Sequence, residues 1–152
     1  MTTTTISSCT VDEFEREPNL DELFAEYASE ASIEGLGECR VQMQMYRQLE
    51  TAGVLHPIVA HQDDKLVGFL SLLISVVPHY GCRIATTESF FVAKAARAGG
   101  AGMKLLRAAE DKARELGVQG LFISAPAGGR LSAVLPHAGY RKTNEVFFRG
   151  FE

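Results

Sequence analysis

The chain has 152 residues, of which 46% are hydrophobic and 22% are charged, and its net charge is −4. This composition is typical of a globular domain, excludes extensive disorder and argues against a nucleic-acid partner. The longest apolar run, residues 67–77, is too short to cross a bilayer as a helix, and no signal-like segment opens the sequence. We therefore expect a single domain over residues 1–152 that is cytoplasmic and has no membrane partner.

The distribution of charge and the cysteines indicate which kinds of partner and which structural sites to expect. Residues 1–50 hold 11 acidic and 3 basic residues, a net charge of −8, which suits a cationic partner, although an ordinary solvated surface accounts for the same pattern. Cys9, Cys39 and Cys82 form no Cys-x-x-Cys pair. The sequence therefore predicts neither a disulfide framework nor a metal site.

The first third of the chain is predicted to hold one strand and two helices. A short strand is expected over residues 6–11. Pro18-Asn19 followed by Glu22 resembles a capping box and predicts a helix start, and the second helix is expected to end near Gly53. Apolar residues recur at helical spacing in both helices: Leu20, Leu23, Phe24, Tyr27 and Ala31 in the first, and Val41, Met45 and Leu49 in the second.

After the second helix, the chain is predicted to form three strands in succession. Helices and strands are then predicted to alternate. The expected strands are 55–61, 66–77, 83–92, 120–125 and a final pair within 140–151, and the expected helices are 103–116 and 131–135. A run of strands before one strand–helix–strand crossover predicts an α/β fold. We expect a central mixed, mostly antiparallel sheet with helices on both faces.

The stretch RAGGAGMK, Arg97 to Lys104, places three glycines at the start of the most regular predicted helix. Glycine in a helix costs about 1 kcal/mol relative to alanine, so the glycines indicate either unusual backbone angles or close approach of a ligand. A strand end, a glycine-rich turn and a helix N-terminus together favour an anion such as pyrophosphate. Neither a P-loop nor a dinucleotide-binding fingerprint fits the spacing. A tight turn without a ligand is the alternative.

Arg97, Gly100 and Gly102 form the pattern Arg-x-x-Gly-x-Gly after a strand ending in Phe90-Phe91-Val92. This resembles the acetyl-CoA pyrophosphate loop of the GNAT superfamily of N-acetyltransferases, and the order of elements resembles the GNAT acyl-CoA N-acyltransferase fold along the whole chain. The short length and the ending are also similar to small GNAT proteins of phage and prophage. The resemblance implies acetyl-CoA (CoA) as cofactor, held by main-chain groups of a strand and of the loop: Phe91, Val92, Arg97, Ala98, Gly99, Gly100, Ala101, Gly102 and Met103.

The resemblance also implies a general base. Acetyl transfer needs a neutral amine, and an alkyl amine has a pKa of about 10.4, so a group must accept its proton. Glu88, nine residues before Arg97, matches the glutamate of several GNAT enzymes; a solvated glutamate facing away is the alternative, because strand register is not fixed by sequence. The tyrosine that many relatives use as general acid is Leu135 here. That role is vacant or filled elsewhere.

We therefore predict an acetyl-CoA-dependent N-acetyltransferase that acts on a primary amine, of a small molecule or a protein, by direct attack in a ternary complex. A CoA-binding module without catalysis and a nucleobase-modifying enzyme are the alternatives. Exposed strand edges are compatible with a homodimer. A row of carboxylates at a spacing of four, predicted to line one helix side, would attract the amine: Glu26, Glu30, Glu34 and Glu38.

Overall fold

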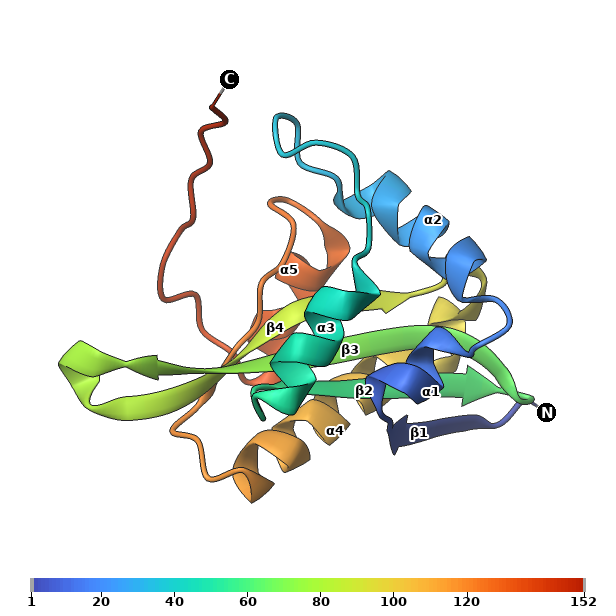
Figure 1. The fold of residues 1–152 in the computed structure, drawn as a ribbon, viewed down its shortest axis with the longest axis horizontal. Helices are drawn as coiled ribbons and strands as arrows, with labels where there is room; N and C mark the ends of the chain where they lie inside the picture. The colour runs from blue at the N-terminus through green and yellow to red at the C-terminus, as the bar shows by residue number, and fades with distance from the viewer. Residues whose placement is uncertain (1, 152) are drawn as a thin grey trace.

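The computed structural model describes residues 2–151 and shows a five-stranded sheet with helices on both faces (Figure 1). The strand order is β1-β2-β3-β4-β5, and each neighbouring pair is antiparallel except β4 and β5, which are parallel. The mixed, mostly antiparallel sheet expected from the sequence is confirmed. The strands are β1 (Thr4–Ser8), β2 (Leu55–Gln62), β3 (Lys65–Val77), β4 (Cys82–Val92) and β5 (Leu121–Phe122).

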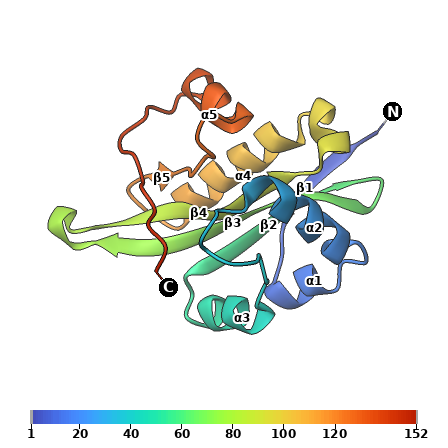
Figure 2. The same ribbon diagram turned by 90° about the horizontal axis from the view of Figure 1, so that it is seen from above.

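The helices separate onto the two faces of the sheet (Figure 2). The long helix α4 connects β4 to β5 and covers one face, whereas α1 and α2 cover the other. None of the helices within residues 2–151 is long and apolar enough to span a membrane. The helices are α1 (Val11–Glu15), α2 (Leu20–Ala31), α3 (Met43–Thr51), α4 (Ala101–Glu115) and α5 (Arg130–Val134).

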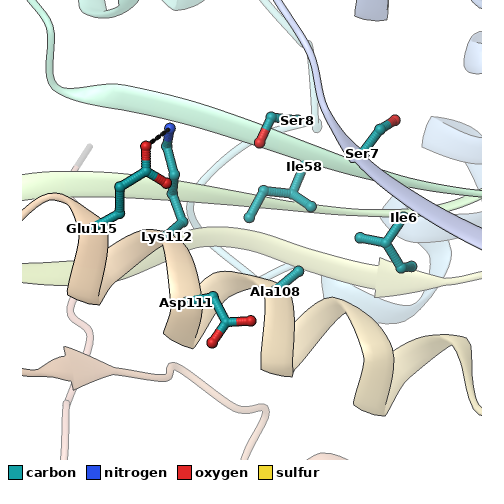
Figure 3. A pocket seen from close by; sticks show the side chains of 8 residues that line it. All are labelled: Ile6, Ser7, Ser8, Ile58, Ala108, Asp111, Lys112 and Glu115. Carbon is teal, nitrogen blue, oxygen red and sulfur yellow. Dashed lines mark ion pairs between the residues drawn. The ribbon is translucent and has the colours of Figure 1, made fainter.

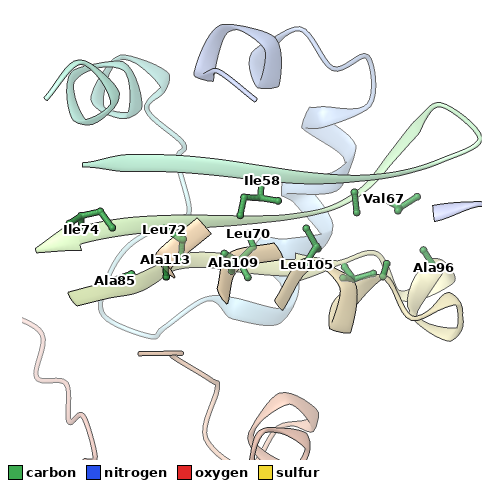
Figure 4. Packing of buried hydrophobic residues seen from close by; sticks show 13 residues of the cluster. Ile58, Val67, Leu70, Leu72, Ile74, Ala85, Ala96, Leu105, Ala109 and Ala113 are labelled. Atoms are coloured by element: carbon green, nitrogen blue, oxygen red, sulfur yellow. The ribbon is translucent and has the colours of Figure 1, made fainter. Parts of the chain in front are cut away.

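The alternation of β3 sorts its side chains between two cores. Leu70 and Leu72 are fully buried against Leu105 and Ala109 of α4, as Figure 4 shows. Phe69, which directly precedes Leu70, points to the opposite face. Successive strand residues point to opposite faces, so this mostly apolar strand supplies both layers of the core and fixes the position of α4.

An aromatic cluster holds α1 and α2 against the sheet. The Phe69 ring lies 5.4 Å from the rings of both Phe24 and Tyr27, and Tyr27 lies 5.4 Å from Phe91 of β4. Edge-on and tilted pairs at such distances are each worth about 0.5–1.5 kcal/mol beyond area burial. The cluster places the middle of α2 next to the end of β4.

The start of α2 differs from the prediction. Asn19 makes no side-chain cap; its Nδ2 donates instead to the carbonyl of Leu66 at 2.8 Å, which ties the helix start to β3. The capping box expected around residues 18–22 is therefore wrong. A capping box does occur earlier, between Thr10 and Glu13, and opens the short helix α1 that the sequence did not predict.

The predicted strands within residues 140–151 are also wrong, because the described residues 139–151 contain no strand. Strand β5 is itself only two residues long, shorter than the predicted 120–125, and the chain after α5 leaves the sheet (Figure 1). A strand requires a neighbouring edge, and local β propensity does not supply one. The exposed fractions of Val146, Phe147 and Phe151 are 88%, 86% and 89%.

Candidate active site

Glu88 is the extra residue of a β-bulge in β4. Ser89 pairs with Ser71 and Thr87 pairs with Leu72 of β3, so Glu88 has no partner in the register. A bulge bends the strand locally and changes the direction of a side chain. The Glu88 side chain is exposed and lies toward α3, where the hydroxyl of Tyr46 donates to its Oε1 at 2.7 Å.

Two tyrosines surround this carboxylate. Burial, the charge of Glu88 and its hydrogen bond together raise the pKa of Tyr46 far above the ordinary value. Burial and the same charge raise the pKa of Tyr27. Both hydroxyls are thus protonated at neutral pH, and that of Tyr46 donates to Glu88. Tyr46 belongs to no sequence motif and so has no role predicted from sequence, and Tyr27 is predicted only to lie on the apolar face of a helix.

The loop before α4 presents unpaired amides. The first hydrogen bond of the helix runs from Lys104 N to Gly100 O at 3.1 Å, so the N–H groups of Ala101, Gly102 and Met103 precede the helical ladder. The first turn of this 15-residue helix contains no acidic residue. Such a helix start favours an anion through its amides and its dipole.

The three glycines of the loop have different structural roles. Gly100 has a φ of 76°, in the left-handed region, and nothing lies within 4 Å of a Cβ built there. At Gly102 a Cβ would meet only a Val92 methyl group, at 3.8 Å. A Cβ at Gly99 would instead lie 2.9 Å from Gln62 Nε2, so this glycine serves packing against β2. The open side at Gly100 and Gly102, together with the free amides, fits a pyrophosphate group.

Arg97 ties the loop to the sheet and to α2. Its Nε donates to the carbonyl of Val92 at 2.9 Å, its Nη2 lies 2.6 Å from Glu30, and its guanidinium lies 5.5 Å from the centre of the Phe91 ring. The side chain therefore points to the end of β4. It fixes where the loop begins.

The predicted row of four carboxylates does not form. Helix α2 ends at Ala31, so Glu34 and Glu38 lie beyond it, and the expectation of one common helix side is wrong for them. Glu30 pairs with Arg97, and Glu26 accepts a hydrogen bond from the Lys94 amide at 3.3 Å. Two members of the row therefore hold the loop region.

Beyond Thr86, β4 has an edge that β5 does not pair. The parallel pairing stops at Thr86 and Phe122, although β4 continues to Val92. Ala93 N donates to Val67 O, and hydrogen-bonded pairs alternate in an antiparallel ladder. Phe91 therefore turns its main-chain groups toward β3, whereas Phe90 and Val92 turn theirs to the unpaired edge. Phe90 was missing from the residues predicted by sequence.

A comparison of the sequence with known protein families identifies the family of this chain. Residues 17–130 match the profile of the Acetyltransferase (GNAT) family. The chain belongs to the GNAT family. This confirms the resemblance seen in the sequence and the expectation of an acetyltransferase. No curated protein matches the chain by sequence.

Solved structures confirm the GNAT fold over the whole chain. An aminoglycoside acetyltransferase from an uncultured soil metagenomic sample has 15% identity and a TM-score of 0.76, with 98% of this chain and 97% of that chain covered. A ribosomal-protein-alanine N-acetyltransferase from Brucella melitensis biovar Abortus 2308 has 20% identity and a TM-score of 0.73, with 99% and 100% covered. For a glucosamine-6-phosphate N-acetyltransferase from Arabidopsis thaliana the values are 13% and 0.74, with 99% of both chains covered.

Leu135 occupies the position at which many GNAT enzymes carry a tyrosine as general acid. Its side chain is apolar and buried, with 8% exposure. The nearby Tyr140 donates its hydroxyl to Glu110 of α4 at 2.6 Å. Burial and this bond raise the pKa of Tyr140. Tyr140 is thus engaged on α4 and disfavoured as a proton donor.

A shallow hollow of about 230 Å³ lies on another part of this GNAT domain (Figure 3). It lies between the edge strand β1 and the C-terminal half of α4, and its polar lining includes the ion pair of Lys112 with Glu115, at 3.8 Å. The free amides precede the other end of the same helix, and Glu88 lies on β4. The hollow is therefore separate from the candidate site.

Proposed function

We propose that this GNAT chain is an acetyl-CoA-dependent N-acetyltransferase that acetylates a primary amine by direct attack within a ternary complex. One observation carries the proposal. The strand that bears Glu88 at its bulge continues as an edge that β5 does not pair, and then leads into the amide-rich loop before α4. A base, a main-chain edge and an anion site thus follow one another along 16 residues, from 88 to 103.

The loop and the strand edge divide the binding of the cofactor. The free amides before α4 would hold the pyrophosphate, with the residues from Ala98 to Met103 forming the cradle. The main-chain groups of Phe90 and the N–H of Val92 would pair with the amide-containing arm, as an added strand would, while the Val92 carbonyl stays bound to Arg97. Arg97 would keep the cradle at the end of β4. When bound, acetyl-CoA supplies an acetyl thioester for transfer.

Glu88 would take the proton from the amine. Presenting an amine of pKa about 10.4 in its neutral form at pH 7 costs on the order of 4–5 kcal/mol. A carboxylate within reach of the amine, directly or through a water, removes much of this cost, and such general bases typically contribute ~10²–10⁴ in rate. With no acid at Leu135, the thiolate would leave without a dedicated donor, which its pKa of about 8.5 permits.

The acceptor is proposed only as a primary amine of a small molecule or a protein. The three relatives named above act, by their names, on an aminoglycoside, on the alanine of a ribosomal protein and on glucosamine 6-phosphate. All three acceptors carry amines in very different settings. The acceptor panel for this chain should therefore span the same range.

The test has two steps. First, thermal unfolding with CoA or ADP should show stabilisation by CoA at micromolar to millimolar concentration. Second, release of free thiol from acetyl-CoA should be followed with aminoglycosides, amino sugars, polyamines and peptides with a free N-terminus, and the acetylated product identified by mass. Stabilisation without amine-dependent thiol release from any acceptor would favour the non-catalytic CoA-binding module. Absence of stabilisation would overturn both functions.

A further inference from the structure

We infer that Tyr46 is a positioning residue for Glu88: its hydroxyl holds one carboxylate oxygen, so that the other is directed to the acceptor amine. This inference rests on the proposed function, in which Glu88 is the general base. It concerns a residue of α3 that is separated from Glu88 by 42 positions in sequence.

The Glu88 carboxylate is held at one of its two oxygens. The Tyr46 hydroxyl donates to Oε1 of Glu88 at 2.7 Å, whereas Oε2 makes no hydrogen bond within residues 2–151. Glu88 is exposed, and an exposed glutamate ordinarily samples several rotamers. A bond to one oxygen restricts this sampling and leaves the second oxygen with free lone pairs. Efficient proton transfer needs such a fixed donor-to-acceptor geometry.

Tyr46 is itself held in place, because α3 is anchored to α1. Its neighbour Arg47 binds two carboxylates of α1, Asp12 at 3.0 Å and Glu15. Glu50, on the same short helix, accepts a hydrogen bond from the Val11 amide at 2.7 Å. Helix α3 is thus joined to α1 on the C-terminal side of Tyr46 by three polar contacts. The hydroxyl therefore acts from a fixed point.

Tyr46 is suited to positioning Glu88 and unsuited to donating a proton to the thiolate. Burial and the Glu88 charge raise the pKa of Tyr46 far above that of a thiol, which is about 8.5. Donation of its proton to the leaving thiolate would be strongly uphill. The hydroxyl keeps its proton and stays a donor to Glu88.

The experiment is a double-mutant cycle on thiol release with the best amine of the panel. Tyr46→Phe removes only the hydroxyl and should lower kcat/KM for the amine about 10-fold, since a hydrogen bond to a charged group is lost. The KM for acetyl-CoA should change less than ~2-fold, because the loop is untouched. In the Glu88→Gln background the same substitution should change kcat/KM by less than ~2-fold, because there is no base left to position.

Tyr140→Phe is the matched control. It also deletes a tyrosine-to-carboxylate hydrogen bond, to Glu110 at 2.6 Å, but outside the proposed site. Its kcat/KM should equal that of the wild type. Thermal unfolding of both variants shows whether either substitution acts through stability.

The outcomes separate the two proposals. If Glu88→Gln is defective but Tyr46→Phe matches the wild type, or lowers kcat/KM equally in both backgrounds, only the positioning role is overturned. A loss of activity in Tyr46→Phe that follows a lower Tm also overturns it. If no amine drives thiol release, or if Glu88→Gln turns over like the wild type, the assignment of Glu88 fails and the positioning role fails with it.

Discussion

The guanidinium of Arg97 lies 2.6 Å from the carboxylate of Glu30 and so joins the loop before α4 to α2, a helix on the opposite face of the sheet. The same guanidinium donates to Val92 O at the end of β4. One side chain thus connects the proposed anion cradle, the proposed cofactor edge and the helix that carries Tyr27. The position of the loop therefore depends on contacts with α2 and β4.

Arg97→Ala should weaken CoA binding about 10-fold, because the loop loses its ties to Val92 and Glu30. Global stability should fall by only about 1 kcal/mol, since the ion pair is partly exposed. Arg97→Lys should restore little, because lysine lacks the planar fork that reaches both partners. Titration calorimetry with CoA and urea unfolding measure the two effects.

Arg107→Ala is the matched control for this change. Arg107 pairs with Glu110 at 2.9 Å on the exposed side of α4. It should bind CoA as the wild type does. Unchanged CoA affinity in Arg97→Ala would contradict the role given to Arg97.

Gly100→Ala should reduce both stability and CoA affinity. The φ of 76° at Gly100 lies in the left-handed region, where a Cβ costs about 1–2 kcal/mol. The added methyl group would also point into open space, where the pyrophosphate is proposed to bind. Gly117→Ala, at a φ of 71° after the end of α4, should cost similar stability and leave CoA affinity unchanged. Equal CoA affinity in the two variants would count against the cradle.

Gly68→Ala, on β3, should displace the neighbouring strand β4 and with it the proposed cofactor edge. A Cβ at Gly68 would lie 2.8 Å from the Phe91 carbonyl oxygen and 3.1 Å from a Val92 methyl group. Because a backbone atom is the nearest neighbour, β4 must shift, and overpacking of this kind typically costs about 1–3 kcal/mol. Gly120→Ala, with nothing within 4 Å of its Cβ, should be near neutral. Differential scanning calorimetry of the two variants checks this.

The cysteines should differ sharply in reactivity. Burial, followed by the charges of Glu13, Glu17 and Glu50, raises the pKa of the Cys9 thiol to about 12 from 9.0. The thiolate is the reacting form. At pH 8, therefore, exposed Cys39 should react promptly with a disulfide reagent, whereas half-buried Cys9 should react far more slowly in the folded protein than after unfolding. Mass mapping of the labelled peptides distinguishes them, and rapid labelling of Cys9 in the folded protein would contradict the burial argument.

The same raised pKa predicts a loss of stability in alkali. Because the folded thiol of Cys9 binds its proton more tightly than the unfolded one, its contribution is fully present below pH 9. It is lost as the pH rises from 9 toward 12. Urea unfolding at pH 8 and pH 10.5 should show a smaller decrease for Cys9→Ala than for the wild type. An equal decrease would show that Cys9 does not contribute.

The sequence predicted the parts of the fold that depend on local pattern. The apolar run of β3 and the helical spacing of Leu105 and Ala109 reflect burial, which periodicity reports directly. The glycines between β4 and α4 located the loop, because few other sequences suit a left-handed residue at a helix start. These features need no knowledge of distant contacts.

The rest depended on partners far apart in the chain. The bulge at Glu88 exists only because β3 and β4 pair with a shifted register, and neither strand encodes this alone. The meeting of Tyr46 with Glu88 depends on how α3 docks on α1. The strands predicted around residues such as Phe147 do not form, because no strand edge in the described chain pairs with this segment.

The role of Glu88 as general base is tested most directly by kcat/KM for the amine in wild type and Glu88→Gln, measured at saturating acetyl-CoA, with the CoA Kd measured in parallel. The kcat/KM of Glu88→Gln should fall by ~10²–10⁴ with an unchanged CoA Kd, because the base is lost and the loop is not. Wild-type turnover by Glu88→Gln would contradict this role.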